Sequence, residues 1–156
     1  MSLKHELGLR KPIKLLPHEA VLNIYFTASR LKKRADAFFR RYGLTDVQFN
    51  AMMLLCHQKG PQGGLSQAEL SDMMLVNRAN ITSLIDRMEK GGLVARTATS
   101  DRRYNIVKLT SRGRKLLERV EPAYVRQVKE TMAVLDPPQQ KSLIRTLEKI
   151  RQQLSE

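Results

Sequence analysis

The chain has 156 residues, of which 28 are Lys or Arg, 15 are Asp or Glu and one is Cys. This length suits one domain with a real core and is too short for two independent domains. The net charge of +13 biases the chain toward polyanions, with nucleic acid ahead of an acidic membrane surface. A single cysteine excludes an intrachain disulfide framework and suits a reducing, cytoplasmic compartment. No apolar run approaches the roughly 18 residues of a membrane span, and no signal peptide is expected.

The N-terminal third is expected to hold an arm and one long helix. Residues 1–16, bounded by two prolines, are predicted to form a flexible arm. A helix is predicted from Glu19 to Tyr42, because apolar residues recur there at alternating steps of 3 and 4 over three heptads. So broad a seam needs more partner surface than one small lobe offers. We expect residues 17–44 to join a homodimer contact, although packing within one chain also explains the seam.

Residues 45–110 are predicted to form a separate lobe. Capping boxes begin at Thr45 and at Ser66, and each opens a short helix. Residues 75–76 then turn the chain into a third helix, Asn77–Lys90, with Asn77 as its N-cap. Two short helices joined by a tight turn, with an outwardly polar second helix, have helix-turn-helix geometry.

The third helix has two different faces. Its apolar residues fall at i, i+3, i+4 and i+7 from Ile81, so short polar and basic side chains occupy the remaining surface. Asn can pair with adenine, Ser and Thr with either base type, and an Ala methyl can pack on the thymine methyl, so this face suits a DNA major groove. Asp86 is assigned to orienting a neighbouring arginine. The candidate DNA-contacting residues are Arg78, Ala79, Asn80, Thr82, Ser83 and Arg87.

A hairpin is predicted directly after this helix, with strands at Leu93–Ala98 and Tyr104–Leu109. A hairpin with a basic tip beside a polar helix forms a winged DNA-reading unit. Ten Lys and Arg stand against three Asp and Glu in residues 78–115, so the positive charge gathers in this unit. The alternative for the tip is a solvated Asp–Arg turn, worth almost nothing energetically. The tip residues are Asp101, Arg102 and Arg103.

The C-terminal third is predicted to be helical. A helix begins after Thr110, and Pro122 should bend it. Asp136 and the two prolines that follow it open a last helix with an apolar stripe. We expect residues 111–156 to pair with residues 17–44 and with a second copy of the chain. The predicted fold class is therefore mainly α: a winged helix-turn-helix with a two- to three-stranded β wing, plus N- and C-terminal dimerisation helices.

Residues 65–117 resemble the winged helix-turn-helix of the MarR family of bacterial transcription regulators. DRMEKGGLV from Asp86 is similar to the family's DRLEKRGLV. Leu75 stands where the family usually has Gly, and Gly91 stands where it often has a basic residue. The family's wing pattern D-x-R-x-x-x-x-x-L-T, with the Gly that follows it, is matched by Asp101, Arg103, Leu109, Thr110 and Gly113.

The resemblance implies a cytoplasmic homodimer that represses, or less often activates, transcription from a pseudo-palindromic operator in double-stranded DNA. It implies that Arg103 enters the minor groove while Asp101 holds its guanidinium, since a narrow groove attracts arginine; Arg102 is expected to contact phosphate. It also implies a small ligand in a cleft between the lobe and the dimer region, with no pocket residue inside the matching motif. The basic cluster Arg30–Arg41 lies beside that cleft in the family arrangement, so an aromatic anion is expected.

Two rival functions stay open at this level. One is sequence-indifferent binding of nucleic acid by the basic face. The other is a thiol-based oxidant sensor of the same fold, acting through Cys56, but that residue shares an apolar stripe with Phe49, Met52 and Met53, so a buried, inert thiol is expected. The chain has no H-E-x-x-H, C-x-x-C, G-x-S-x-G or phosphate-loop spacing. We therefore expect no catalytic residue, no metal site and no cofactor.

Overall fold

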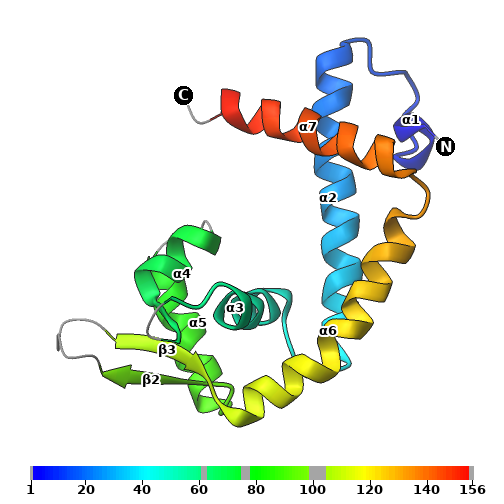
Figure 1. Cartoon of the computed structure of the whole chain (residues 1–156). Coiled ribbons are helices and arrows are strands. Elements are labelled where there is room, and N and C mark those ends of the chain that lie inside the picture. Colours follow the sequence, from blue (N-terminus) through cyan, green and yellow to red (C-terminus); the bar gives the residue numbers. More distant parts are fainter. Residues whose placement is uncertain (1, 61–62, 75–77, 99–104, 155–156) are drawn as a thin grey trace.

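The computed structural model describes residues 2–60, 63–74, 78–98 and 105–154. The first part of this chain forms α1 (Leu3–Glu6), α2 (Leu16–Arg40) and α3 (Asp46–His57). Then follow β1 (Leu65–Ser66), α4 (Gln67–Met74), α5 (Arg78–Lys90), β2 (Val94–Ala98) and β3 (Asn105–Leu109). The chain ends with α6 (Ser111–Met132) and α7 (Pro137–Gln153). Figure 1 shows a lobe of α3, α4, α5 and the sheet, which α6 joins to an extended part made of α2 and α7. This helical part is called the arm from here on and is distinct from the N-terminal residues 1–16. The predicted fold class, mainly α with a winged helix-turn-helix, is confirmed.

The core lies in the lobe and at its junction with the arm. The apolar face of α5 is buried there, as predicted: Ile81, Ile85 and Met88 are 0% exposed. Phe39 of α2 stacks on Phe49 of α3 with ring centroids 4.5 Å apart, and the ring of Tyr124 on α6 lies 4.8 Å from that of Phe49. Burial of an aromatic side chain stabilises a fold by about 1.5–3 kcal/mol. This aromatic cluster therefore fastens α2 and α6 to the lobe.

Helix caps form where the sequence predicted them. At the start of α3 the Thr45 hydroxyl accepts from the Gln48 N–H at 3.2 Å, and the Gln48 side chain accepts from the Thr45 N–H at 2.9 Å. The same reciprocal box forms between Ser66 and Glu69 before α4, and another at Asp136 before α7. Each box satisfies two backbone N–H groups that the helix itself leaves without partners. The predicted cap of α5, Asn77, lies outside the described residues.

The sheet has the strand order β1-β3-β2, and both pairings are antiparallel. The predicted hairpin corresponds to β2 and β3, while β1 adds a short third strand through Leu65, which pairs with Val107. Gly64 precedes β1, and a Cβ at this position would lie 2.3 Å from the Val107 carbonyl oxygen. Only glycine allows this approach, so residue 64 fixes how closely β1 can join the sheet.

The N-terminal segment differs from the expectation of an arm without regular structure. Residues 3–6 form the single helical turn α1, and Leu3 is only 6% exposed. A carboxylate oxygen of Glu6 lies 2.9 Å from a guanidinium nitrogen of Arg30 on α2, which ties the turn to the long helix. α2 itself begins at Leu16, because Pro17 is accommodated in the first turn, where no backbone donor is lost. The boundaries 1–16, 17–44, 45–110 and 111–156 stay predictions.

α6 carries Pro122 in its interior and changes direction along its length in Figure 1, as expected from the missing N–H and the bulk of the ring. The N-terminal half of α6 packs on the lobe, whereas its C-terminal half runs beside α2. The helix therefore connects the two parts of the molecule. No helix of the described chain combines the length and apolar character that a membrane crossing requires.

Candidate nucleic-acid interface and ligand cleft

The polar face of α5 that is predicted to contact DNA is solvent-exposed; we call it the recognition face, and α5 the recognition helix. Its apolar positions point into the core, and the predicted DNA-contacting positions Ala79, Asn80, Thr82, Ser83 and Arg87 are all exposed. Arg78 opens the helix, but its side chain lies outside the described part. The structure thus brings five of the six predicted helix residues onto the surface of one helix.

A groove separates this helix from the start of α3. It has a volume of about 560 Å³ and is lined by Thr45 and Gln48 on one side and by Asn80, Ser83 and Arg87 on the other. The Arg87 Nε donates to the Ser83 carbonyl oxygen at 3.1 Å, which holds the guanidinium along the helix. The N-terminus of α3 lies beside the groove; its capping box occupies the N–H groups of Thr45 and Gln48, and the positive end of the helix dipole favours an anion there. The surface is therefore suited to a phosphate backbone as well as to base edges.

Arg96 of β2 is an important residue that sequence reasoning missed. Its guanidinium contacts Asp86 at 2.5 Å and also binds Glu89, both on α5. Its backbone N–H donates to the second oxygen of Glu89 at 2.9 Å. This backbone hydrogen bond is the main cause of the lowered pKa of Glu89, and it outweighs the opposing effect of partial burial. The prediction that Asp86 orients a neighbouring arginine agrees with this contact, although the partner lies in the wing strand.

The same arginine reaches α4. With the Gln67 amide oriented to satisfy both of its ends, the oxygen accepts from Arg96 Nε at 3.0 Å and the nitrogen donates to the Thr82 hydroxyl at 3.0 Å. The network therefore joins α4, the recognition helix and the wing. A sequence signal existed, because strand alternation places Arg96 on the face of buried Val94, where a charged side chain needs a partner.

The wing tip residues Asp101, Arg102 and Arg103 lie outside the described residues. The strands that lead to the tip are described, and Figure 1 shows β2 and β3 projecting from the lobe beside α5. The wing contacts therefore stay predictions.

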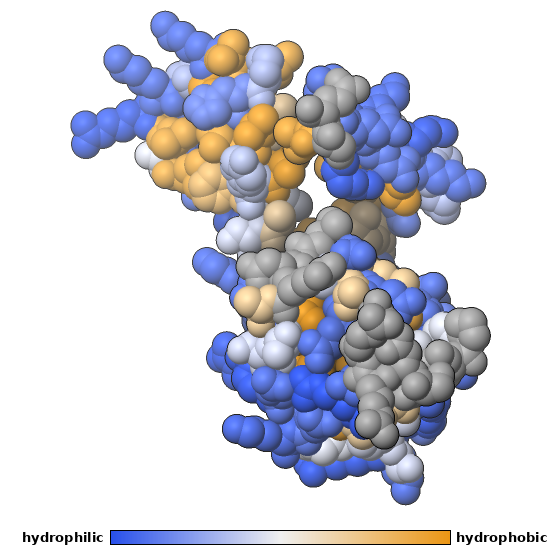
Figure 2. Space-filling view, turned by 90° about the vertical axis from the view of Figure 1, so that its left-hand side faces the viewer, coloured by the Kyte–Doolittle hydropathy of each residue, from blue (hydrophilic) through white to orange (hydrophobic). Residues whose placement is uncertain are grey.

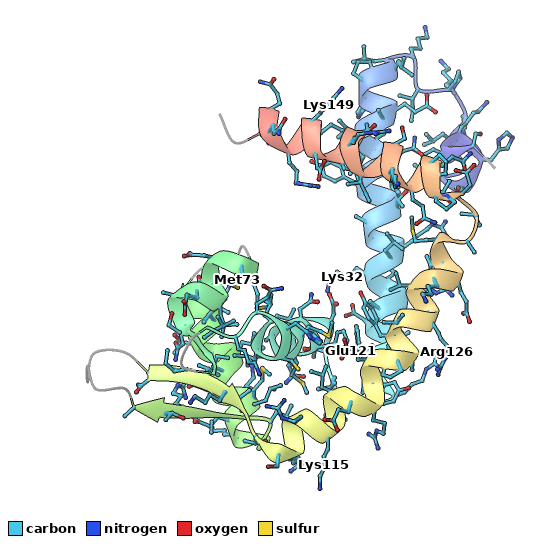
Figure 3. All side chains as sticks on the ribbon, in the orientation of Figure 1. Lys32, Met73, Lys115, Glu121, Arg126 and Lys149 are labelled. Carbon is cyan, nitrogen blue, oxygen red and sulfur yellow. The ribbon has the colours of Figure 1, made fainter. Side chains whose placement is uncertain are left out.

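A second candidate site lies between α2 and α6, on the side of the arm that faces the lobe. This ligand cleft has a volume of about 460 Å³. Its walls are mainly apolar and include Leu31, Val128 and Met132. Lys32 and Arg34 add positive charge and Asp46 adds a negative charge, with the Lys32 Nζ 3.9 Å from an Asp46 carboxylate oxygen. Burial, followed by the charge of Asp46, raises the pKa of Tyr124, so its phenol stays neutral against the cleft. Figure 3 shows Lys32 on this inner side of α2.

Cys56 on α3 is a free thiol that is half-buried and packs against the core. The sequence predicted a buried thiol, and the structure buries it only in part. The neighbouring His57 pairs with Glu121 of α6 through Nε2 at 2.9 Å, a contact between the lobe and α6. Among the described residues, no group of three or more His, Cys, Asp or Glu side chains could hold a metal ion.

Comparison with known proteins agrees with this geometry. A MarR family model matches residues 42–103. A putative transcriptional regulatory protein for the hcr operon of Thauera aromatica is 35% identical over 135 residues, which cover 81% of this chain and 79% of that protein. The HTH-type transcriptional repressor Rv2887 of Mycobacterium tuberculosis is 31% identical over 128 residues, covering 81% and 89%. The crystal structure of the M. tuberculosis transcriptional regulator MOSR in complex with DNA superposes with a TM-score of 0.69 at 25% identity, covering 86% of this chain and 97% of MOSR.

The predicted resemblance is thereby confirmed. The matched region contains the three lobe helices and β2, whose contacts build the exposed recognition face. These relatives are transcription regulators and not enzymes, in agreement with the sequence prediction. The chain belongs to the MarR family of transcriptional regulators, with the winged helix-turn-helix fold of DNA-binding proteins.

Proposed function

We propose that two copies of the chain bind a pseudo-palindromic operator in double-stranded DNA and repress transcription, and that a small ligand modulates the binding. The observation that carries this proposal is the exposed polar face of α5, held to the wing by Arg96. Repression is favoured because a related protein is named a repressor, and MOSR, with a similar fold, was crystallised with DNA.

Exposed apolar surface on the arm is the evidence for a homodimer. α7 has no buried residue in the single chain, although its sequence carries an apolar stripe. Figure 2 shows hydrophobic residues gathered over the arm, above a mostly hydrophilic lobe. A continuous apolar surface of this kind normally marks an interface. The exposed apolar residues of the two long arm helices include Val21, Ile24, Tyr25, Leu31, Leu143, Ile144 and Ile150.

The geometry of a dimer gives the proposal a specific form. Two recognition helices related by a two-fold axis enter successive major grooves about 10 base pairs apart, so the operator is a pseudo-palindrome. Positive side chains on the same face release counterions from the phosphates, so affinity falls steeply with added salt.

The ligand cleft supports the proposal that a small ligand modulates DNA binding. Its volume of about 460 Å³ falls in the usual range of small-molecule sites, roughly 300–1,000 Å³. Apolar walls beside the Tyr124 ring suit an aromatic body. Arg34 suits a negative group, whereas Lys32 already lies beside the carboxylates of Asp36 and Asp46. The cleft lies where α6 leaves the lobe, so a ligand that prefers one angle between lobe and arm would shift the affinity for DNA.

Selection of bound duplexes from a random DNA pool tests this function. We expect an enriched pseudo-palindrome, protected on one face across two successive major grooves. Equal affinity for selected and random duplexes would support the sequence-indifferent rival instead.

The thiol-sensing rival is tested by Cys56→Ser. Because Cys56 packs against the core, we expect the variant to keep operator binding, and peroxide to change the parent slowly or not at all. Release of the parent from DNA by low peroxide, with the Ser variant still bound, would favour the thiol sensor.

A further inference from the structure

A second cleft lies on the outer side of the arm, away from the ligand cleft. We name it the outer arginine cleft; it has a volume of about 430 Å³ between α2 and α6. Three arginines line it: Arg34 and Arg41 from the C-terminal part of α2 and its cap, and Arg126 from α6. Figure 3 shows Arg126 on the side of the arm opposite to Lys32, which lines the ligand cleft.

Charge in the outer arginine cleft is unbalanced. The residues that line it include three exposed arginines and one carboxylate, that of Glu130. Within the described part of the chain, Arg34, Arg41 and Arg126 form no ion pair, in contrast to Arg30 with Glu6 and Arg96 with its two carboxylates. Like charges held near one another destabilise a fold, and an anion bound among them removes that repulsion.

An aromatic ring supports Arg41, one of the three arginines of the cleft. The Arg41 guanidinium lies 5.9 Å from the centroid of the Phe38 ring, and Phe38 is only 5% exposed. Arg119, from the preceding turns of α6, does not line the cleft, but its guanidinium lies over the ring of Tyr42, which does, 5.7 Å from the ring centroid. A guanidinium stacked on a ring keeps its edge N–H groups free, and that edge forms paired hydrogen bonds with phosphate or carboxylate oxygens. The Phe38 ring thus preorganises the Arg41 donors and lowers the entropy that this side chain loses on binding.

We infer that the outer arginine cleft binds a small, multiply charged anion that carries phosphate groups. Guanidinium groups from two helices need more than one negative charge to be satisfied together. The volume admits a small phosphorylated metabolite, and Glu130 with Gln127 can bond to its hydroxyl groups.

An anion in the outer arginine cleft can affect the ligand cleft and the packing of α2 against α6. Arg34 and Gln127 line both the outer arginine cleft and the ligand cleft, so the two sites share two side chains. An anion that bridges Arg41 to Arg126 links α2 to α6 and favours one packing of these helices. This inference goes beyond the proposed function and does not rest on it.

Calorimetric titration of the full chain with sodium pyrophosphate, at constant ionic strength, tests the inference. We expect saturable binding that weakens at least tenfold in the double variant Arg41→Gln with Arg126→Gln. The matched control is Arg145→Gln with Lys149→Gln, which removes two positive charges from exposed positions on α7 and should bind like the parent. Circular dichroism melting of both variants confirms that the surface changes leave the fold intact.

Three results would overturn the inference. The parent would show no saturable heat, the Arg41 and Arg126 double variant would bind as tightly as the parent, or citrate would bind more tightly than pyrophosphate and assign the site to polycarboxylates. A double variant that keeps pyrophosphate binding but loses affinity for duplex DNA would show instead that these arginines grip the DNA backbone.

Discussion

At the scale of single residues, Arg96 connects the recognition helix to the wing. Its guanidinium is shared between Asp86 and Glu89, and its side chain is 21% exposed. The two carboxylates lie one turn apart on α5 and repel each other when the arginine is absent. The residue therefore positions α5 against the wing strand and does not itself need to touch DNA.

Replacement of Arg96 by Ala should destabilise the lobe. The variant leaves two neighbouring carboxylates without their shared partner, and we expect a loss of about 1–3 kcal/mol in the free energy of unfolding. Urea denaturation of parent and variant measures this difference. Arg87→Ala is the control, since Arg87 is exposed and bonds only within its own helix among the described contacts; its stability should change little. Equal stability of the Arg96 variant and the parent would contradict the positioning role.

The lowered pKa of Glu89 gives a prediction about pH. Its carboxylate is favoured in the folded state, so it contributes stability above the unfolded-state pKa, near the ordinary value of 4.5. That contribution is lost as the pH falls through the lower folded-state pKa. Glu89→Gln should therefore have a lower melting temperature than the parent at pH 7. The difference between the two melting temperatures should become smaller in acid. Melting temperatures between pH 7 and pH 3 measure this difference; a difference that stays constant would exclude Glu89 as its source.

At the scale of helices and strands, local signals predicted most elements. The capping residues at Thr45, Ser66 and Asp136 act on the next turn of the chain, so their neighbours in sequence suffice to identify them. The buried face of α5 follows from its period for the same reason. The burial of Leu3 and the partners of Arg96 depend on residues distant in sequence, and no local pattern specifies them.

Gly113 shows tertiary structure overriding helix propensity. It lies in the first turn of α6, where Ala would normally be favoured by up to about 1 kcal/mol. A Cβ at this position would lie 2.1 Å from the Leu93 carbonyl oxygen, so Gly113→Ala should destabilise the chain. Gly91→Ala is the control, because its nearest contact would be 3.4 Å. Denaturation midpoints of the two variants measure the effect, and a stabilised Gly113 variant would contradict the close packing of α6 on the β2 side of the lobe.

At the scale of the whole molecule, the two parts differ in how they bury apolar surface. The lobe encloses its own core, whereas α7 crosses the arm with no buried residue. Figure 1 shows α7 extending from the arm over the lobe, with its C-terminal end reaching beyond α2. A second copy of the chain can cover this surface and set the spacing between two recognition helices.

The dimer is tested by a charge placed on the apolar surface of α7. Ile144 is 54% exposed, so Ile144→Lys should leave the single chain folded. In a dimer the new charge would be buried without a partner, at a cost of several kcal/mol. We therefore expect a monomer by analytical ultracentrifugation, with operator affinity reduced because only one half-site can be held. Ser142→Lys adds the same charge at an exposed polar position of α7 and should stay dimeric. An Ile144→Lys protein that remains a dimer and keeps full operator affinity would show that the two copies meet through another surface.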